Sequence, residues 1–231
     1  MDLILEGIKK AFFLLISFDP EVIKITLLSI EVSGAATLIS LIIGISVGVA
    51  VALSRFAGKR FIVSLINTGM GLPPVVVGLF VTIFLWRNGP LGFFHLMYTP
   101  GAMIIAQVII AFPIVVGFTM AGTQQLDPKL RLQILSLGAS RSQLLWLLLK
   151  EARLPLLAAI MAGFGAVISE VGASMMVGGN IRGYTRVLTT ATVLEVSKGR
   201  FELAAGLSII LTGMPEWRPM PSQNTSVFIV R

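Results

Sequence analysis

Long apolar runs separated by short polar connectors dominate this sequence. A transmembrane helix needs about 20 apolar residues to cross the hydrocarbon core of a bilayer. Runs of this length lie at residues 25–53, 61–86, 102–123 and 154–179. A further apolar run at residues 203–214 is too short to cross a bilayer alone. The pattern therefore predicts an all-α integral membrane protein with five spans, the last of them incomplete.

Composition agrees with a multi-pass membrane protein. The 231 residues are 55% hydrophobic and 13% charged, with a mean hydropathy of +0.92, whereas about a quarter of the residues in a soluble domain are charged. The net charge of +7 does not imply nucleic acid as a partner, because basic residues flank membrane spans and meet lipid headgroups. The absence of cysteine and the single histidine, His95, exclude disulfides, thiolate zinc sites and His-rich metal sites.

The N-terminal residues carry a separate amphipathic pattern. Leu5, Ile8, Phe12 and Leu15 recur at helical spacing among charged residues. The apolar run that follows is short and lacks a small-residue cleavage site, so it does not match a signal peptide. We expect an interfacial helix at this end of the chain.

Prolines interrupt two of the predicted spans. The run at 61–86 contains Pro73-Pro74 between glycines, which must bend or break a helix. Irregular backbone at membrane depth is tolerated where it is buried in protein or lines a wet cavity. Pro113 has the same effect in the run at 102–123. Lining of a transport pathway and a simple kink both fit these prolines. Small residues at every fourth position from Ala36 to Ala52 predict close helix packing.

The connector at 127–153 predicts two short helices joined at a glycine. Asp127 can cap the first helix, Gly138 suits a left-handed stop, and Ser140 with Gln143 forms a capping box for the second. The first helix is expected to place Leu130, Ile134 and Leu137 on one face. An interfacial helix and a docking helix for a cytoplasmic partner both fit this pattern.

One acid, Glu170, lies within the apolar run at 154–179. A charged side chain near the bilayer centre costs about 3 kcal/mol, so such residues pair, protonate or face the bundle interior. An acid repels anions, and we therefore expect a structural or gating role for Glu170 rather than ligation of an anion. Met175 and Met176 fit either a hydrophobic constriction or ordinary core packing.

Four segments together resemble one family. They are "GLPPVVVGL", "LGASR", "KEARLPLLAA" and "ISEVGASMMVGGNIRGYTRVLTTATVLEVSKGRFELA". They are similar to the permease subunit of tungstate ABC transporters, which neighbours the molybdate and sulfate permeases, and the resemblance covers roughly residues 20–210. The sequence departs from the family pattern at two places. Leu132-Gln133-Ile134 replaces the Glu-Ala-Ala of the coupling loop, and the tail at 215–231 does not continue an apolar helix, which suggests a shifted reading frame or another artefact.

The resemblance implies an assembly in the cytoplasmic (inner) membrane. The expected partners are a second copy of the chain, a dimeric ABC ATPase that binds ATP and Mg²⁺, an extracytoplasmic oxyanion-binding protein, and membrane lipid. Residues 127–153 would form the cytoplasmic coupling loop, and residues 180–200 would lie outside. The ATPase-coupling candidates are Leu130, Ile134, Leu137, Gly138, Ala139, Ser140 and Arg141. The pathway or gate candidates are Pro73, Pro74, Glu170, Ser174, Met175 and Met176. The binding-protein or anion-facing candidates are Asn180, Arg182, Tyr184 and Arg186, within a basic outer segment that also holds Lys198 and Arg200.

The expected function is ATP-driven import of a tetrahedral oxyanion, tungstate in the first place, by alternating access. The chain has no phosphate-cradling G-x-x-x-x-G-K-[ST] loop, so we expect a transport subunit without catalysis or a cofactor of its own. A molybdate or other oxyanion permease is the alternative. An ion-coupled secondary transporter or a channel is a further one, although the chain shows neither an inverted repeat nor clustered acids at membrane depth.

Overall fold

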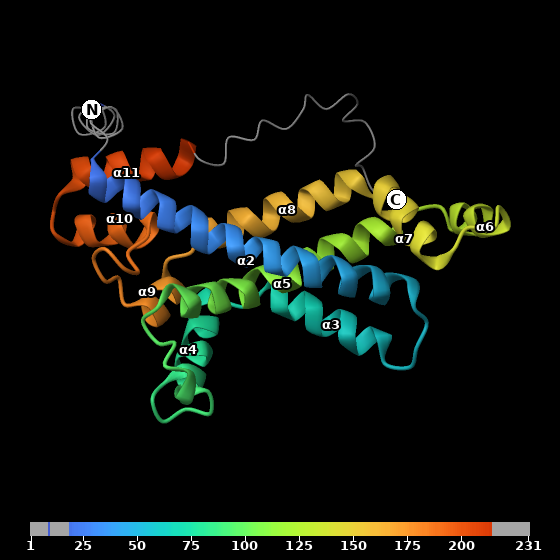
Figure 1. Ribbon diagram of the computed structural model, residues 1–231, viewed down its shortest axis with the longest axis horizontal. Helices are drawn as coiled ribbons and strands as arrows, with labels where there is room; N and C mark the ends of the chain where they lie inside the picture. Colours follow the sequence, from blue (N-terminus) through green and yellow to red (C-terminus); the bar gives the residue numbers. More distant parts are fainter. Residues whose placement is uncertain (1–8, 10–18, 214–231) are drawn as a thin grey trace.

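The computed structural model describes Lys9 and residues 19–213, which form helices and connecting turns without a strand (Figure 1). The predicted N-terminal interfacial helix and the tail at 215–231 lie outside the described residues. The helices are α2 (Pro20–Leu53), α3 (Lys59–Met70), α4 (Pro74–Leu85), the 3₁₀ turn η1 (Gly92–Phe94), α5 (Pro100–Gln124), α6 (Pro128–Ser136), α7 (Arg141–Glu151), α8 (Arg153–Ile168), α9 (Gly172–Gly178), α10 (Leu188–Ser197) and α11 (Phe201–Gly213).

The most extensive helix–helix contact of the bundle is the packing of α2 against α5. The predicted stripe of small residues on α2 faces this contact. A Cβ atom on Gly44 would lie 2.8 Å from Val115 Cγ1, and one on Gly48 would lie 2.8 Å from Thr119 Cβ. Small residues therefore let the two backbones approach closely, as the four-residue repeat predicts. Pro113 was expected to bend or break its helix; α5 continues through it, so there is no break at this proline.

Two helix pairs bend sharply. The axes of α3 and α4 differ by 101°, and the axes of α7 and α8 differ by 73°. Because proline lacks a backbone N–H and restricts the residue before it, Pro73-Pro74 ends the first helix and starts α4 at Pro74. The predicted break in the run at 61–86 is therefore present.

The run at 154–179 is not one helix, contrary to our expectation. The helix α8 ends at Ile168, and the short helix α9 begins at Gly172. Glu170 lies in the break between them and not on a continuous helix face. Gly172 at the start of α9 and Ser169 at the end of α8 are weak helix formers. The tertiary contacts described below hold the break in place.

The predicted helix–Gly–helix connector is present. The Asp127 carboxylate accepts a hydrogen bond from the Lys129 N–H at 2.8 Å. Gly138 has a φ of +81°, in the left-handed region that favours glycine. Ser140 and Gln143 form a complete capping box at the start of α7.

Different helices lie at the two ends of the long axis of the molecule. The helices α6 and α7 lie at one end, and α10, α11 and the start of α2 lie at the other (Figure 1). The second end is held by apolar side chains of α2, α10 and α11, including Val22, Leu188 and Leu207. Two of the described helices, α2 and α5, are long and apolar enough to cross a membrane, and the bent pairs bring the number to four if each is one span.

Candidate functional site

Two helix breaks lie next to each other in the fold. The break before α4 and the break before α9 lie side by side, because α4 and α9 pack against each other. A Cβ atom on Gly172 would lie 2.6 Å from Val75 Cγ2, and one on Gly78 would lie 2.7 Å from Ala173 Cα. Both glycines therefore permit a contact that no larger residue would allow. Pro73 and Pro74 position this contact by fixing where α4 begins.

Glu170 holds the start of α9. Its Oε1 accepts a hydrogen bond from the backbone N–H of Ala173 at 2.7 Å, and its backbone oxygen accepts one from the Thr189 hydroxyl at 2.9 Å. The residue is 7% exposed. A carboxylate at a helix start satisfies an N–H that has no partner within the helix and interacts favourably with the helix dipole. The geometry therefore gives Glu170 a structural role in this conformation.

The two candidate gate methionines diverge. Met176 is half-buried, and its sulfur would lie 3.2 Å from a Cβ on Gly78, so it packs against α4. Met175 is 37% exposed on the outer side of α9. Met175 is therefore the more exposed of the two methionines.

Ser174 lies on the buried side of α9. Its hydroxyl accepts a hydrogen bond from Gln107 Nε2 of α5 at 3.3 Å, and both side chains are buried. The surrounding side chains are apolar, including those of Ala106, Ala173 and Val177. A buried polar pair in such surroundings is costly unless it is bonded. The pair therefore fixes α9 on α5.

The loop after α9 is tied to the helix end. The Thr185 hydroxyl donates to the Gly178 backbone oxygen at 2.6 Å, and the Tyr98 N–H donates to the Val177 oxygen at 2.9 Å. Asn180 has a φ of +52°, and its amide donates to the Thr190 oxygen at 3.3 Å. The loop therefore has one defined shape.

Both loop arginines are paired with an acid from α2. Arg182 Nε donates to Glu21 Oε1 at 2.8 Å, and its Nη2 contacts Oε2 of the same carboxylate. Arg186 Nη1 lies 3.5 Å from Glu21 Oε1, and Arg186 Nε donates to Asn180 Oδ1 at 3.2 Å. The hydrogen bond and the charge of Glu21 raise the pKa of Arg182 above its usual value. The predicted basic segment is therefore partly neutralised within the chain.

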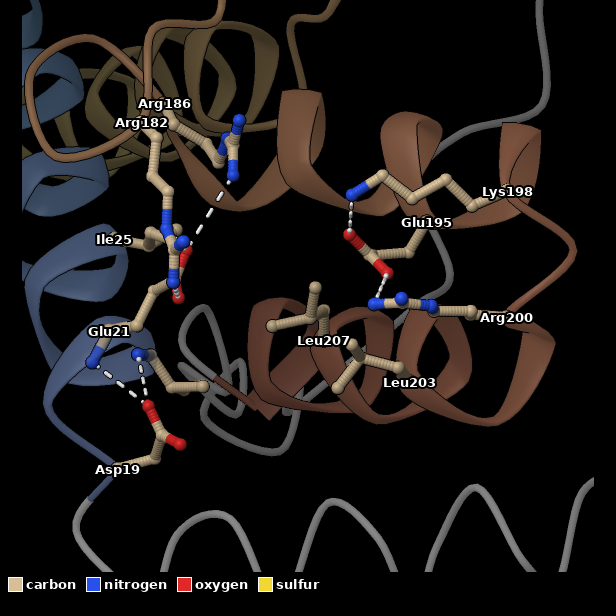
Figure 2. A pocket seen from close by; sticks show the side chains of 11 residues that line it. Asp19, Glu21, Ile25, Arg182, Arg186, Glu195, Lys198, Arg200, Leu203 and Leu207 are labelled. Carbon is tan, nitrogen blue, oxygen red and sulfur yellow. Dashed lines mark hydrogen bonds and ion pairs between the residues drawn. The ribbon is translucent and has the colours of Figure 1, made fainter.

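The other two cations of the segment share a second acid. Lys198 Nζ lies 2.8 Å from Glu195 Oε1, and Arg200 Nη1 lies 3.6 Å from Glu195 Oε2. The two acid–base clusters stand on opposite walls of a pocket of about 330 Å³, with apolar side chains of α2 and α11 between them (Figure 2). Tyr184 is half-exposed and faces a different pocket, beside Lys24 and Glu31.

The ATPase-coupling candidates lie at the opposite end of the molecule. Ile134 is buried against Leu144 and Leu148 of α7, and Leu130 and Ala139 pack at the edge of the same cluster. Leu137 is 86% exposed. Leu130, Ile134 and Leu137 were expected on one face of the first helix, but Ile134 is buried against α7 whereas Leu137 is exposed. Leu132 of α6 is also exposed. Gly138 and Ser140 shape the turn between the helices, and Arg141 is the first residue of α7.

A comparison with family models identifies this arrangement. Residues 40–213 match the binding-protein-dependent transport system inner membrane component. The chain belongs to this family. It is thus an inner-membrane component of a binding-protein-dependent transport system, as the hydropathy pattern and the resemblance predict.

Individual relatives agree with the family. The chain is 41% identical over 211 residues to the tungstate uptake system permease protein TupB of Peptoclostridium acidaminophilum, which covers 91% of this chain and 92% of that protein. It is 40% identical over 197 residues to a probable anion ABC transporter permease protein of Haloferax volcanii, covering 83% and 85%. A crystal structure of an amino acid ABC transporter with histidines shares the fold, with a TM-score of 0.63 at 19% identity over 88% of this chain and 92% of that chain.

Three site residues of this transport component escaped the sequence analysis. The basic pattern of the outer segment does not point to Glu21 or Glu195, although an acid in the first turn of a long helix is a usable signal for Glu21. Gln107 was visible as an amide within an apolar run. Its partner Ser174 could not be paired with it from sequence, because 67 residues separate them.

Proposed function

We propose that this chain is the permease subunit of an ATP-driven importer that moves a tetrahedral oxyanion, tungstate, across the cytoplasmic membrane by alternating access. The observation that carries the proposal is the 41% identity to a tungstate uptake system permease protein over 91% of the chain. An identity that extends over both ends of the molecule includes the coupling connector and the outer loop. The substrate and the partners of that relative then become expectations for this chain.

The partners follow from the polarity of the molecule. The capped helices α6 and α7 would form the cytoplasmic contact with the ATPase, with Leu137 as the exposed apolar contact. The pocket end would face outward, toward the oxyanion-binding protein. The chain itself would supply no catalysis and hold no cofactor, while ATP and Mg²⁺ would bind to the ATPase. A second copy of the chain would complete the pathway.

The elements around the two helix breaks would control passage. In the proposed cycle, Met175 forms part of the closed constriction, because it is the more exposed of the two candidate gate methionines. Glu170 and Ser174 hold α9 in place and do not touch the anion. Displacement of α9 from α4 and α5 would open the pathway.

Uptake by cells tests the substrate. The gene would be expressed with its ATPase and its binding protein in a strain that lacks its own tungstate and molybdate importers. We expect intracellular tungsten, measured by mass spectrometry, to rise when submicromolar tungstate is supplied, and to remain at background without the ATPase. Molybdenum uptake in preference to tungsten would make the chain a molybdate permease. Uptake that persists without the ATPase would contradict the proposal and support an ion-coupled transporter or a channel.

A further inference from the structure

The pocket at the outer end brings together charges that lie far apart in the sequence. Its first wall consists of Arg182 and Arg186 around Glu21. Its second wall consists of Lys198 and Arg200 around Glu195 (Figure 2). Each wall therefore has two cations and one carboxylate, and each keeps one positive charge in excess.

A third acid at the rim does not cancel this excess. The Asp19 carboxylate accepts hydrogen bonds from the N–H groups of Glu21 and Val22 at 2.9 and 3.2 Å. Its charge is thus directed at the start of α2, where the helix dipole is positive. The lining of the pocket as a whole keeps a positive excess and favours one incoming negative charge.

The space between the walls is apolar. Val22 and Ile25 of α2 face Leu203 and Leu207 of α11 across it. A free tetrahedral oxyanion could use the charged walls but would gain nothing from these side chains. A carboxylate on a methylene stem fits both parts, because the stem can lie on the apolar side chains while the carboxylate meets the cations.

We propose that this pocket is a socket, that is, a docking site for one acidic side chain of the extracytoplasmic binding protein. Until that side chain binds, Glu21 forms ion pairs with Arg182 and Arg186 in its place. The inference rests on the proposed function and names the docking contact within it. Glu21 is suited to exchange because its pair with Arg182 is accessible from solvent, with side-chain exposures of 73% for Arg182 and 39% for Glu21, so an incoming carboxylate can reach the arginines. Arg186 is 15% exposed and already aimed by Asn180, so it is held ready for the incoming carboxylate.

The socket adjoins the helix that the proposed function treats as mobile. Arg186 donates to the backbone oxygen of Asn180 at 3.4 Å, and Thr185 donates to the last residue of α9. The arginine wall is therefore built on the loop that holds the end of α9. Docking at this wall is contiguous with the element that would open the pathway.

The decisive variant is Glu21→Gln. It removes the internal competitor and keeps the size of the side chain. We expect the permease–ATPase complex in nanodiscs to bind the tungstate-loaded binding protein of the same organism about two- to fivefold more tightly, as the loss of one exposed ion pair predicts. Arg186→Gln should weaken the same binding about tenfold, because it leaves the partner's carboxylate without its cation. Both effects should shrink in high salt.

Two substitutions on α2 serve as matched controls. Glu31→Gln makes the same chemical change on the same helix, and Lys24→Gln removes one cation near the same end, but neither residue lines this pocket. Both should leave the affinity within about twofold of the unmodified complex, the size of a screened surface effect. The melting temperature of each variant complex shows that it has assembled.

The outcomes separate the inference from the function it rests on. An affinity that is unchanged or weaker in Glu21→Gln overturns the socket, as does a control that changes as much as the pocket variants. Variant effects that depend on anionic lipid in the nanodisc, with no effect on the binding protein, also overturn it and make the pocket a phospholipid site. Failure of the unmodified complex to bind the loaded binding protein contradicts the proposed function instead.

Discussion

At the scale of single residues, Glu170 shows how a membrane protein can keep an acid in an apolar run. The carboxylate accepts the Ala173 N–H, and the backbone oxygen of the same residue accepts the Thr189 hydroxyl. The residue thus joins the start of α9 to α10. The geometry favours a carboxylate that caps the start of a helix over one that lines an anion site.

Substitution of Glu170 separates a structural role from a gating role. Glu170→Ala removes the acceptor at the start of α9 and should cost about 1 kcal/mol, as the loss of a helix cap does. Glu170→Gln keeps an acceptor oxygen and should cost less. The melting temperature of the purified complex and oxyanion uptake measure these effects, with the exposed Glu151→Ala on α7 as the control for the melting temperature alone. Loss of transport in Glu170→Gln at an unchanged melting temperature would contradict the structural role and indicate that the charge itself gates the pathway.

At the scale of elements, the breaks in the helices could be predicted only where the covalent chain requires them. Proline requires the break before α4, and a glycine with positive φ ends the α6 segment before α7. The break before α9 carries no such signal, because it is held by contacts with Val75, Gln107 and Thr189, which lie in other segments of the chain. Pro113 gives the converse case, since α5 continues through it in close contact with α2 and α8.

Close packing of α4 on α9 favours glycine at position 78. A Cβ on Gly78 would lie 2.7 Å from the Ala173 backbone, whereas one on Gly34 of α2 has no atom within 4 Å. Gly78→Ala should therefore separate the helices and cost about 1–3 kcal/mol, the range for overpacking. Gly34→Ala should be neutral or slightly stabilising, because alanine favours the helix. A lower melting temperature and weaker uptake for the first variant alone would agree with this; equal behaviour of the two variants would refute the contact.

At the scale of the whole molecule, the α2–α5 contact lies between the end that carries α6 and α7 and the end that carries the charged pocket. The family followed from the resemblance of four segments, whereas the helical class, the capped connector and the basic segment could be predicted from local patterns. The pairing of that segment with Glu21 and Glu195 could not, because it depends on how α2, α10 and α11 come together in space. The basic residues are visible in the sequence, but only the fold shows that they already form ion pairs with acids of the same chain.

Reconstituted transport tests the central claim most directly. The permease and its ATPase would be placed in proteoliposomes, with ATP inside and the tungstate-loaded binding protein outside. We predict tungsten accumulation that requires ATP, the ATPase and the binding protein together, and that persists when ion gradients are collapsed. Accumulation of tungsten that follows an ion gradient in the absence of ATP would contradict the account.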